Sequence, residues 1–306
     1  MKRTLITIML LATVIVLAWR FVPAGPVTIP KAASAATGEG DPFVSFTRHW
    51  RDDPIWHDGQ AEVAIYDATR TIYGKPRPYT ARLYTNKEQA SRDTKTKSDT
   101  GRGRPVFKHH LREDIETENY TYHYSTMCYV GTADLKSLKI DMGSQEDCGA
   151  TFKQFVNHAG TLEWHQFSYF PREGHTRGSY RPPANLAYQD ALSLILRGYP
   201  FDEPTDPIEL ALVVDQTATR RTAAEPSVAT VHYGGRETLD LPIGRVETHR
   251  LQARAKNHEG SATLDHDYWF AAEGNAPWLH VMVQYVGPGG VTFKLREHKR
   301  WAYWER

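Results

Sequence analysis

Alternating residue types recur along this chain in short runs, and this pattern limits the fold more than any other feature. From Tyr120 to Val130, every second position carries Tyr, Thr, Cys or Val, which is typical of a β-strand with two usable faces. The runs follow one another too closely to leave room for crossover helices, so antiparallel pairing is favoured. We therefore predict a mostly β fold, built as a large antiparallel curved sheet or half-barrel.

Turn residues separate the predicted strands at short intervals, for example at 57–59, 158–160 and 287–290. Between Asn86 and Arg104 the chain carries no apolar residue larger than Ala, and we expect an exposed, mobile loop there. The predicted strands cover residues 62–73, 79–85, 106–111, 120–130, 138–142, 150–157, 161–170, 208–214, 228–233, 245–255, 263–271, 278–286 and 291–301. We assign all of them to a single domain over residues 42–306.

One principal helix is predicted, over about residues 182–198. Pro182 and Pro183 can open a helix, and Arg197 followed by Gly198 can close one. Between them, apolar residues recur at helical spacing and form one stripe: Leu186, Ala187, Ala191, Leu194 and Ile195. Such a stripe usually packs against a core. We expect this helix to plug or cap the sheet, or to link its two halves.

The N-terminus carries a targeting segment. Lys2 and Arg3 precede an apolar run from Leu5 to Trp19, which is long for a signal-peptide core and short for a membrane span. Two interpretations stay open. Residues 1–22 could be a cleaved signal peptide or an uncleaved signal anchor.

Both interpretations place the body of the protein outside the cytoplasm. The anchor would be a membrane helix over residues 5–22, and the basic residues before it would keep the N-terminus cytoplasmic. Residues 23–41, rich in Pro, Ala and Gly, are expected to form a flexible tether. The expected location is therefore extracytoplasmic, in the periplasm or at the cell surface, with the protein either anchored or secreted.

A polar interruption, SQEDCG at residues 144–149, is predicted to be a corner between two strands, because Gly149 permits a sharp bend. It contains one of the chain's two cysteines, Cys148, and the other is Cys128. An even number of cysteines in an oxidising compartment favours a disulfide between them. The alternatives are two free, buried thiols, or a nucleophilic Cys148 activated by His158 or His165 with Gln145 near an oxyanion.

Several motifs carry a resemblance to a known family: SQEDCGATF at 144–152, STM at 125–127, WHDGQAEV at 56–63, Arg70, and Tyr73 with Gly74. With them, the stretch from Trp56 to Tyr169 resembles a family of exported, β-rich bacterial proteins, frequently lipoproteins, that is often labelled septum formation inhibitor. The resemblance implies a half-barrel of the lipocalin-like or lipoprotein-carrier-like kind. It implies no catalytic residue, because the family has no established activity. This chain lacks a cysteine just after its apolar run, so the usual lipid attachment is not expected.

Charge and motifs argue against several functions. The net charge is +1, with basic and acidic residues interleaved, so no basic face for nucleic acid is expected. Histidine spacing matches no zinc motif, and the chain has no phosphate loop, nucleophile elbow or dinucleotide fingerprint. We therefore predict no metal, no cofactor and no nucleic-acid partner.

The candidate site residues lie in or near the predicted corner: Ser144, Gln145, Glu146, Cys148, Glu163 and His165. The leading interpretation is a binding or envelope-associated module whose concave face holds an apolar or amphipathic ligand, such as a lipid or an envelope polymer. One alternative is an envelope hydrolase or transferase in which Glu146, Asp147, Glu163 and His165 supply acid and base groups. Another is a purely structural envelope protein.

Overall fold

The structure is a computed structural model, and it describes residues 40–158, 160–205, 207–256, 263–273 and 278–305. These residues belong to one compact unit of the chain. The predicted membrane segment and signal peptide, within residues 1–22, lie outside the described ranges. Within those ranges, no helix is both long enough and apolar enough to span a membrane.

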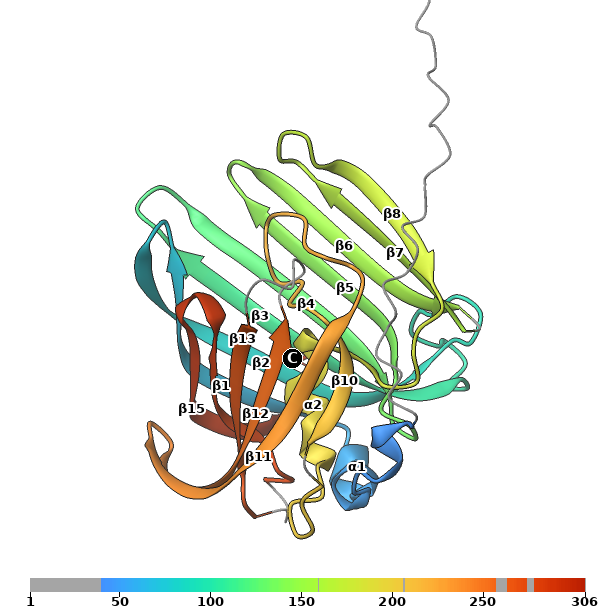
Figure 1. Cartoon of the computed structure of the whole chain (residues 1–306), viewed down its shortest axis with the longest axis vertical. Helices are drawn as coiled ribbons and strands as arrows, with labels where there is room; N and C mark the ends of the chain where they lie inside the picture. Colours follow the sequence, from blue (N-terminus) through green and yellow to red (C-terminus); the bar gives the residue numbers. More distant parts are fainter. Residues whose placement is uncertain (1–39, 159, 206, 257–262, 274–277, 306) are drawn as a thin grey trace, which may run out of the picture. The chain divides into compact units, whose positions relative to one another are not determined.

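Fifteen strands of the described chain form one sheet (Figure 1). Their bounds are β1 Ala61–Ile72, β2 Lys75–Ala90, β3 Arg104–Glu116, β4 Thr121–Gly131, β5 Ser137–Glu146, β6 Gly149–His158, β7 Thr161–Ser168, β8 Gly174–Tyr180, β9 Leu186–Tyr188, β10 Ile208–Val213, β11 Ser227–Leu241, β12 Gly244–Lys256, β13 Thr263–Ala271, β14 Met282–Gly287 and β15 Val291–Trp301. The sheet order is β8 back to β1, followed by β15 back to β9.

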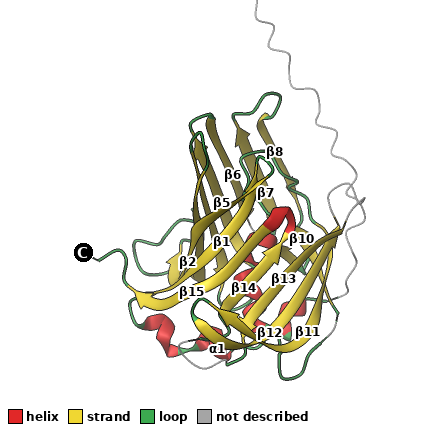
Figure 2. Cartoon of the chain, turned by 90° about the vertical axis from the view of Figure 1, so that its left-hand side faces the viewer, coloured by secondary structure: helices red, strands yellow, loops and turns green. Residues whose placement is uncertain are grey.

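The sheet is an antiparallel meander with one exception. Every neighbouring pair is antiparallel except β9 and β10, which are parallel. Because β8 and β9 stand at its two edges, the sheet is open. Figure 2 shows its curvature. The prediction of a mostly β fold with a large antiparallel curved sheet is confirmed.

Pairing of the first strand with the last divides the sheet into two wings. Ala61 of β1 lies opposite Trp301 of β15, and Thr69 lies opposite Thr292. We call β1–β8 the first wing and β9–β15 the second wing. The two wings are therefore joined along the β1–β15 ladder.

The predicted strands are confirmed in position, and most of them extend beyond the predicted bounds. β2 continues through Ala90, so the expected loop from Asn86 to Arg104 is shorter than predicted. Lys87 explains the error, because it pairs with Phe107 of β3 and its Nζ lies 5.5 Å from the centre of that ring. Long polar side chains can thus form a strand when their stems cover aromatic surface. Strands β8 and β9 were not predicted.

The prediction of a continuous helix over residues 182–198 is wrong. Leu186–Tyr188 form β9 and pair with Ala211–Val213 of β10, so this part of the apolar stripe is a strand. Only residues 189–198 are helical, in three short pieces: η3 Gln189–Ala191, α2 Leu192–Ile195 and η4 Leu196–Gly198. We call residues 189–198 the plug. The remaining short helices are η1 Pro42–Val44, α1 His49–Asp52, η2 Pro54–His57 and η5 Pro288–Gly290.

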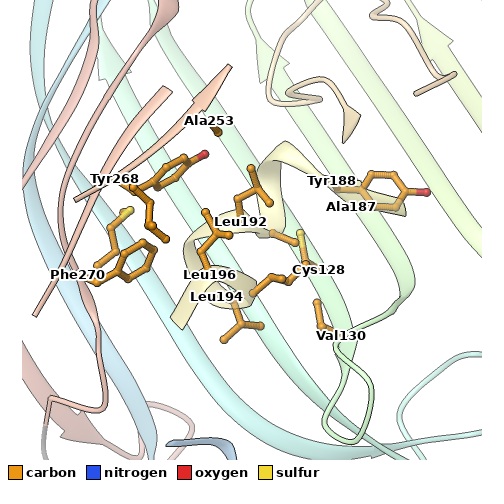
Figure 3. Close-up of a cluster of buried hydrophobic side chains, with 14 of the residues drawn as sticks. Cys128, Val130, Ala187, Tyr188, Leu192, Leu194, Leu196, Ala253, Tyr268 and Phe270 are labelled. Carbon is orange, nitrogen blue, oxygen red and sulfur yellow. The ribbon is translucent and has the colours of Figure 1, made fainter. Parts of the chain in front are cut away.

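The plug fills the space between the wings (Figure 3). Leu192, Leu194 and Leu196 are fully buried. On one side they face Cys128 of β4, and on the other they face Phe270 of β13. Apolar residues thus occur on both sides of this segment because each side packs against one wing. This placement agrees with the predicted role as a plug.

A buried ion pair fastens the plug to the sheet. Arg197 donates to both carboxylate oxygens of Glu62 on β1, at 2.7 and 3.0 Å, and its Nε donates to the carbonyl of Leu279 at 2.9 Å. The guanidinium also stacks over Trp50 and Trp56, 5.0 and 5.6 Å from the ring centres. Burial alone would raise the pKa of Glu62, but the neighbouring Arg197 and His298 hold that pKa well below its ordinary value.

Loss of one partner of this pair should be costly. Arg197→Met leaves Glu62 buried without its cation, and we expect the free energy of unfolding to fall by about 3–5 kcal/mol. Urea denaturation of the purified protein measures this change. The matched control is Arg296→Met, which breaks a pair with Asp67 whose side chains are 45% and 48% exposed and should cost about 1 kcal/mol or less. Equal losses in the two variants would contradict a structural role for Arg197.

Candidate functional site

Two adjoining cavities lie between the wings, next to the plug, and together we call them the polar cleft. Their volumes are about 60 Å³ and about 190 Å³. Both are lined by Gln189, Asp215, Tyr285 and Val291, so they share one wall. A water molecule needs roughly 10–15 Å³ of such space, and the cleft can therefore hold more than isolated waters.

The apolar and polar walls of the cleft come from different elements. Six strands, β2, β3, β10, β13, β14 and β15, each supply one of these apolar side chains: Leu83, Leu111, Leu212, Leu264, Met282 and Phe293. The plug and the chain just after β10 supply most of the polar groups. The cleft thus has apolar walls and one polar end, a combination typical of small-molecule sites.

Two carboxyl groups, from Asp190 and Asp215, meet at this polar end. Asp190 follows β9 and Asp215 follows β10, and the register places Tyr188 opposite Val213. Asp190 and Asp215 therefore each lie two residues beyond this pair. Because the two strands are parallel, both aspartates lie at the same end of the β9–β10 ladder. Asp215 is exposed and Asp190 is half-buried.

The carboxyl pair is held by hydrogen bonds. Asp190 accepts from the backbone N of Gln216 at 3.0 Å and from Thr217 Oγ1 at 2.9 Å, while Asp215 accepts from the backbone N of Thr217 at 2.8 Å. Burial and the adjacent Asp215 raise the pKa of Asp190 well above its usual range, because two close carboxylates resist ionising together.

Gln189 and two tyrosines lie beside the carboxyl pair. The Gln189 side chain donates from Nε2 to Tyr268 Oη, whereas its Oε1 has no hydrogen-bond partner among the described residues, although the residue is only 7% exposed. The Tyr268 and Tyr285 rings are 4.9 Å apart. Tyr285 Oη and His266 Nδ1 share a hydrogen bond of 2.8 Å, and burial lowers the pKa of His266 to about 4, so this imidazole is neutral at pH 7.

Arg70 borders the cleft, but its charge is already paired. Its Nη2 lies 3.2 Å from Glu113 Oε2, and its Nη1 donates to the carbonyl of Thr217 at 2.9 Å. Tyr79 Oη also donates to Glu113. Burial raises the pKa of Glu113, and the opposing effect of Arg70 does not cancel it. Arg70 thus has a carboxyl partner of its own in Glu113, and the cleft holds two further carboxyl groups, those of Asp190 and Asp215.

Polar residues on the inner face of the first wing hold down the chain that follows β10. We call residues 214–224 the cover segment. Lys153 Nζ donates to the carbonyl of Gln216 at 2.8 Å and to Thr222 Oγ1 at 3.1 Å. Thr126 Oγ1 lies 2.6 Å from Thr217 Oγ1, and Gln166 Nε2 donates to the carbonyl of Thr222 at 2.9 Å. These contacts account for polar side chains on the inward face of β4, β6 and β7.

The corner predicted at residues 144–149 is confirmed in place but is shorter than predicted, because β5 continues to Glu146 and β6 begins at Gly149, which leaves only residues 147 and 148 in the turn. Gly149 has φ of 154°, and a Cβ there would lie 2.3 Å from the Tyr169 ring. The strand alternation places Ser144 and Glu146 on the inner face, where both are buried. Gln145 faces outward, into a shallow groove of about 490 Å³.

The remaining sequence-predicted site residues do not join this corner. Glu163 and His165 lie on the outer face of β7, since the buried Leu162 and Gln166 occupy its inner face. His165 stacks on His175 of β8, with ring centres 5.6 Å apart. Glu146 therefore faces the opposite side of the sheet from these two residues. A concerted acid–base step cannot combine them.

The two cysteines are not bonded to each other, so the expected disulfide is absent from this structure. Cys128 is buried and Cys148 is exposed, and Cys148 Sγ donates to Tyr120 Oη at 3.2 Å. Gln145, just before the turn that contains Cys148, is paired with His123 of β4. His123 is five residues along β4 from Cys128. Five strand residues span about 16 Å, whereas a disulfide requires Cα atoms within about 7 Å.

The sequence analysis did not find the polar cleft. Asp190 and Asp215 each follow a short apolar run, LAY and LALVV, and that position was the available signal. The signal becomes informative only when β9 and β10 are known to be parallel. The predicted helix over residues 182–198 hid this pairing.

Comparisons with protein-family models, with curated proteins and with solved structures find no match to this chain. The resemblance to an exported, β-rich family therefore stays a prediction. The structure confirms only its coarser part, a β-rich fold with a large curved sheet.

The buried lysine should give stability a characteristic pH dependence. Burial lowers the pKa of Lys153 from 10.5 to about 8. Between these values the unfolded chain binds more protons than the folded one, so the free energy of unfolding should rise with pH, by roughly 3 kcal/mol in total. Urea denaturation from pH 7.5 to 10.5 should show that Lys153→Met removes this rise.

The matched control is Lys294→Met, which removes an exposed lysine of β15 and should keep the slope of the wild type. The comparison is between the pH dependence of the free energy of unfolding in each variant and that in the wild type, because other groups titrate in the same range. A wild type and a Lys153→Met variant with the same slope would contradict the expected effect of burial.

Proposed function

We propose that the protein is an extracytoplasmic binding module, tethered to the membrane or exported, that holds a small amphipathic molecule in the polar cleft. The observation that carries this proposal is the pair of adjoining cavities with apolar walls and one polar end. Apolar walls favour the burial of hydrocarbon. The polar end offers hydrogen-bond acceptors that a ligand head group can satisfy.

The size of the cleft narrows the choice of ligand. Pockets for drug-sized molecules measure about 300–1,000 Å³, and the two cavities are smaller than that. A short apolar group fits better than a complete acyl chain. An envelope lipid or polymer would therefore be recognised through a short segment, with its remainder outside the cleft.

The catalytic alternative names Glu146, Asp147, Glu163 and His165. Glu146 and His165 lie on opposite faces of the sheet, which weighs against a site that combines these two groups. A purely structural role is what remains if the cleft binds nothing. The binding proposal is therefore tested on the cleft itself.

A bulky side chain in the shared wall should abolish binding. Val291 lines both cavities, and Val291→Trp is expected to fill them. Native mass spectrometry should detect a small molecule on wild-type protein purified from its own membrane fraction, and none on the variant. A saturating ligand at roughly 100 times its Kd should also stabilise the wild type by about 2.7 kcal/mol, which thermal unfolding measures across a panel of short amphiphiles.

The matched control places the same substitution on a surface. Val228 on β11 is 43% exposed, and Val228→Trp should bind and unfold like the wild type. Circular dichroism shows whether each variant is folded. Empty wild-type preparations, with no stabilisation by any member of the panel, would refute the binding proposal.

A further inference from the structure

Three acceptors converge at the polar end of the cleft. They are the carboxyl groups of Asp190 and Asp215 and the unpartnered Oε1 of Gln189. Each carboxyl group accepts one or two bonds from the protein, whereas a carboxylate offers about four acceptor positions. Gln189 is nine-tenths buried, so its free acceptor costs stability unless a ligand supplies a donor. The site therefore calls for a ligand with several donors.

Two cations, Arg70 and Lys153, lie near this end of the cleft and feel the charge of the aspartates, but neither forms an ion pair with Asp190 or Asp215. Within the described ranges, no Lys, Arg or His lies at ion-pair distance from Asp190 or Asp215. Arg70 is paired with Glu113, and Lys153 donates to the cover segment. The nearby His266 is neutral at pH 7 because burial lowers its pKa to about 4. A cation from outside would fill this role.

Aromatic rings and aliphatic side chains adjoin the acceptors. Tyr268 and Tyr285 line the cleft, and Phe293 lies 5.6 Å from Tyr285, measured between ring centres. Aromatic faces attract an organic cation by cation–π interaction. Leu83 and Leu111 continue the wall, where a hydrocarbon group can pack. Acceptors next to aromatic and aliphatic side chains favour an organic cation over an inorganic one.

We propose that the polar end of the cleft binds the ammonium group of a small primary alkylamine. Its N–H groups donate to Asp190, Asp215 and Gln189 Oε1, and its alkyl group packs against the apolar wall. The assignment rests on the proposed binding function and names the chemical class of its ligand.

Other head groups fit these residues less well. An alcohol has one donor for three acceptors, and a carboxylate or phosphate would be repelled by the two aspartates. A quaternary ammonium carries the charge but no N–H. Calcium takes six to eight oxygen ligands, and the described residues hold no group of three or more His, Cys, Asp or Glu side chains suited to a metal.

Ammonium binding should also release a proton. In the free protein, burial and the neighbouring Asp215 raise the pKa of Asp190 well above its ordinary value. A bound cation stabilises both carboxylates and so lowers this pKa. Four of the charged and titratable groups near the pair, Arg70, Glu113, Lys153 and His266, already have partners within the protein. The others are Cys128, Tyr188, Tyr268 and Tyr285, whose pKa values burial raises.

Isothermal titration calorimetry of the full chain can test the assignment with four matched probes: n-hexylamine, n-hexanol, hexanoate and hexyltrimethylammonium. Hexylamine should bind at least about 10-fold more tightly than the other three, as expected for hydrogen bonds to charged groups. Titrations in two buffers of different ionisation enthalpy should show proton release for hexylamine and none for hexanol.

Two variants with the same change in charge, one inside the cleft and one outside it, show whether hexylamine binding depends on Asp215. Asp215 is exposed, and Asp215→Asn keeps an oxygen that can accept from Thr217 N, so this variant should fold. It is expected to weaken hexylamine binding by about 10–100-fold and to leave hexanol binding unchanged. Asp67→Asn on the outer face of β1 is the control, and it should leave both affinities unchanged.

The possible results separate this assignment from the binding proposal. If hexanol, hexanoate or hexyltrimethylammonium binds as tightly as hexylamine, or if Asp215→Asn and Asp67→Asn behave alike, the ammonium assignment is overturned while the cleft still binds ligands. If none of the four probes binds and the amphiphile panel also fails, the binding proposal falls together with it.

Discussion

The buried pair between Arg197 and Glu62 is the contact on which the interior arrangement depends. Removing two charges from water is costly, and only close, well-directed hydrogen bonds offset the cost. Here the guanidinium contacts a carboxylate on β1, the Leu279 carbonyl before β14, and two tryptophan rings before β1. One side chain thereby ties the plug to three parts of the chain. The plug cannot shift without leaving a buried charge unpaired.

The fixed position of the plug has a consequence for the polar cleft. Gln189 and Asp190 stand at the start of the plug, and β9 just before them is paired with β10. These residues are therefore held from both sides, by the Arg197–Glu62 pair and by the β9–β10 ladder. Binding groups on such a support lose little conformational freedom when a ligand arrives. An otherwise mobile, short helical segment can in this way present precisely placed acceptors.

Local patterns in the sequence predict the strands well and the interior poorly. The alternation from Tyr120 to Val130 predicts β4, because a half-buried strand repeats every two residues. Burial on all sides removes such a period, so the apolar segment from Leu186 to Ile195 is compatible with either a strand or a helix. The cleft depends on that choice. The pairing of Asp190 with Asp215 follows from a parallel ladder between strands that no local pattern connects.

Polar residues on the inner face of the first wing explain why the interior is not a continuous apolar core. Thr126, Lys153 and Gln166 occupy positions where apolar side chains would pack most favourably, and instead they bond to the cover segment. Burying such groups is costly unless they are hydrogen-bonded, and the cover segment supplies the partners. The cover segment also carries Asp215 at the exposed side of the cleft. The same hydrogen bonds that hold the segment down therefore also hold one of the two carboxyl groups in place.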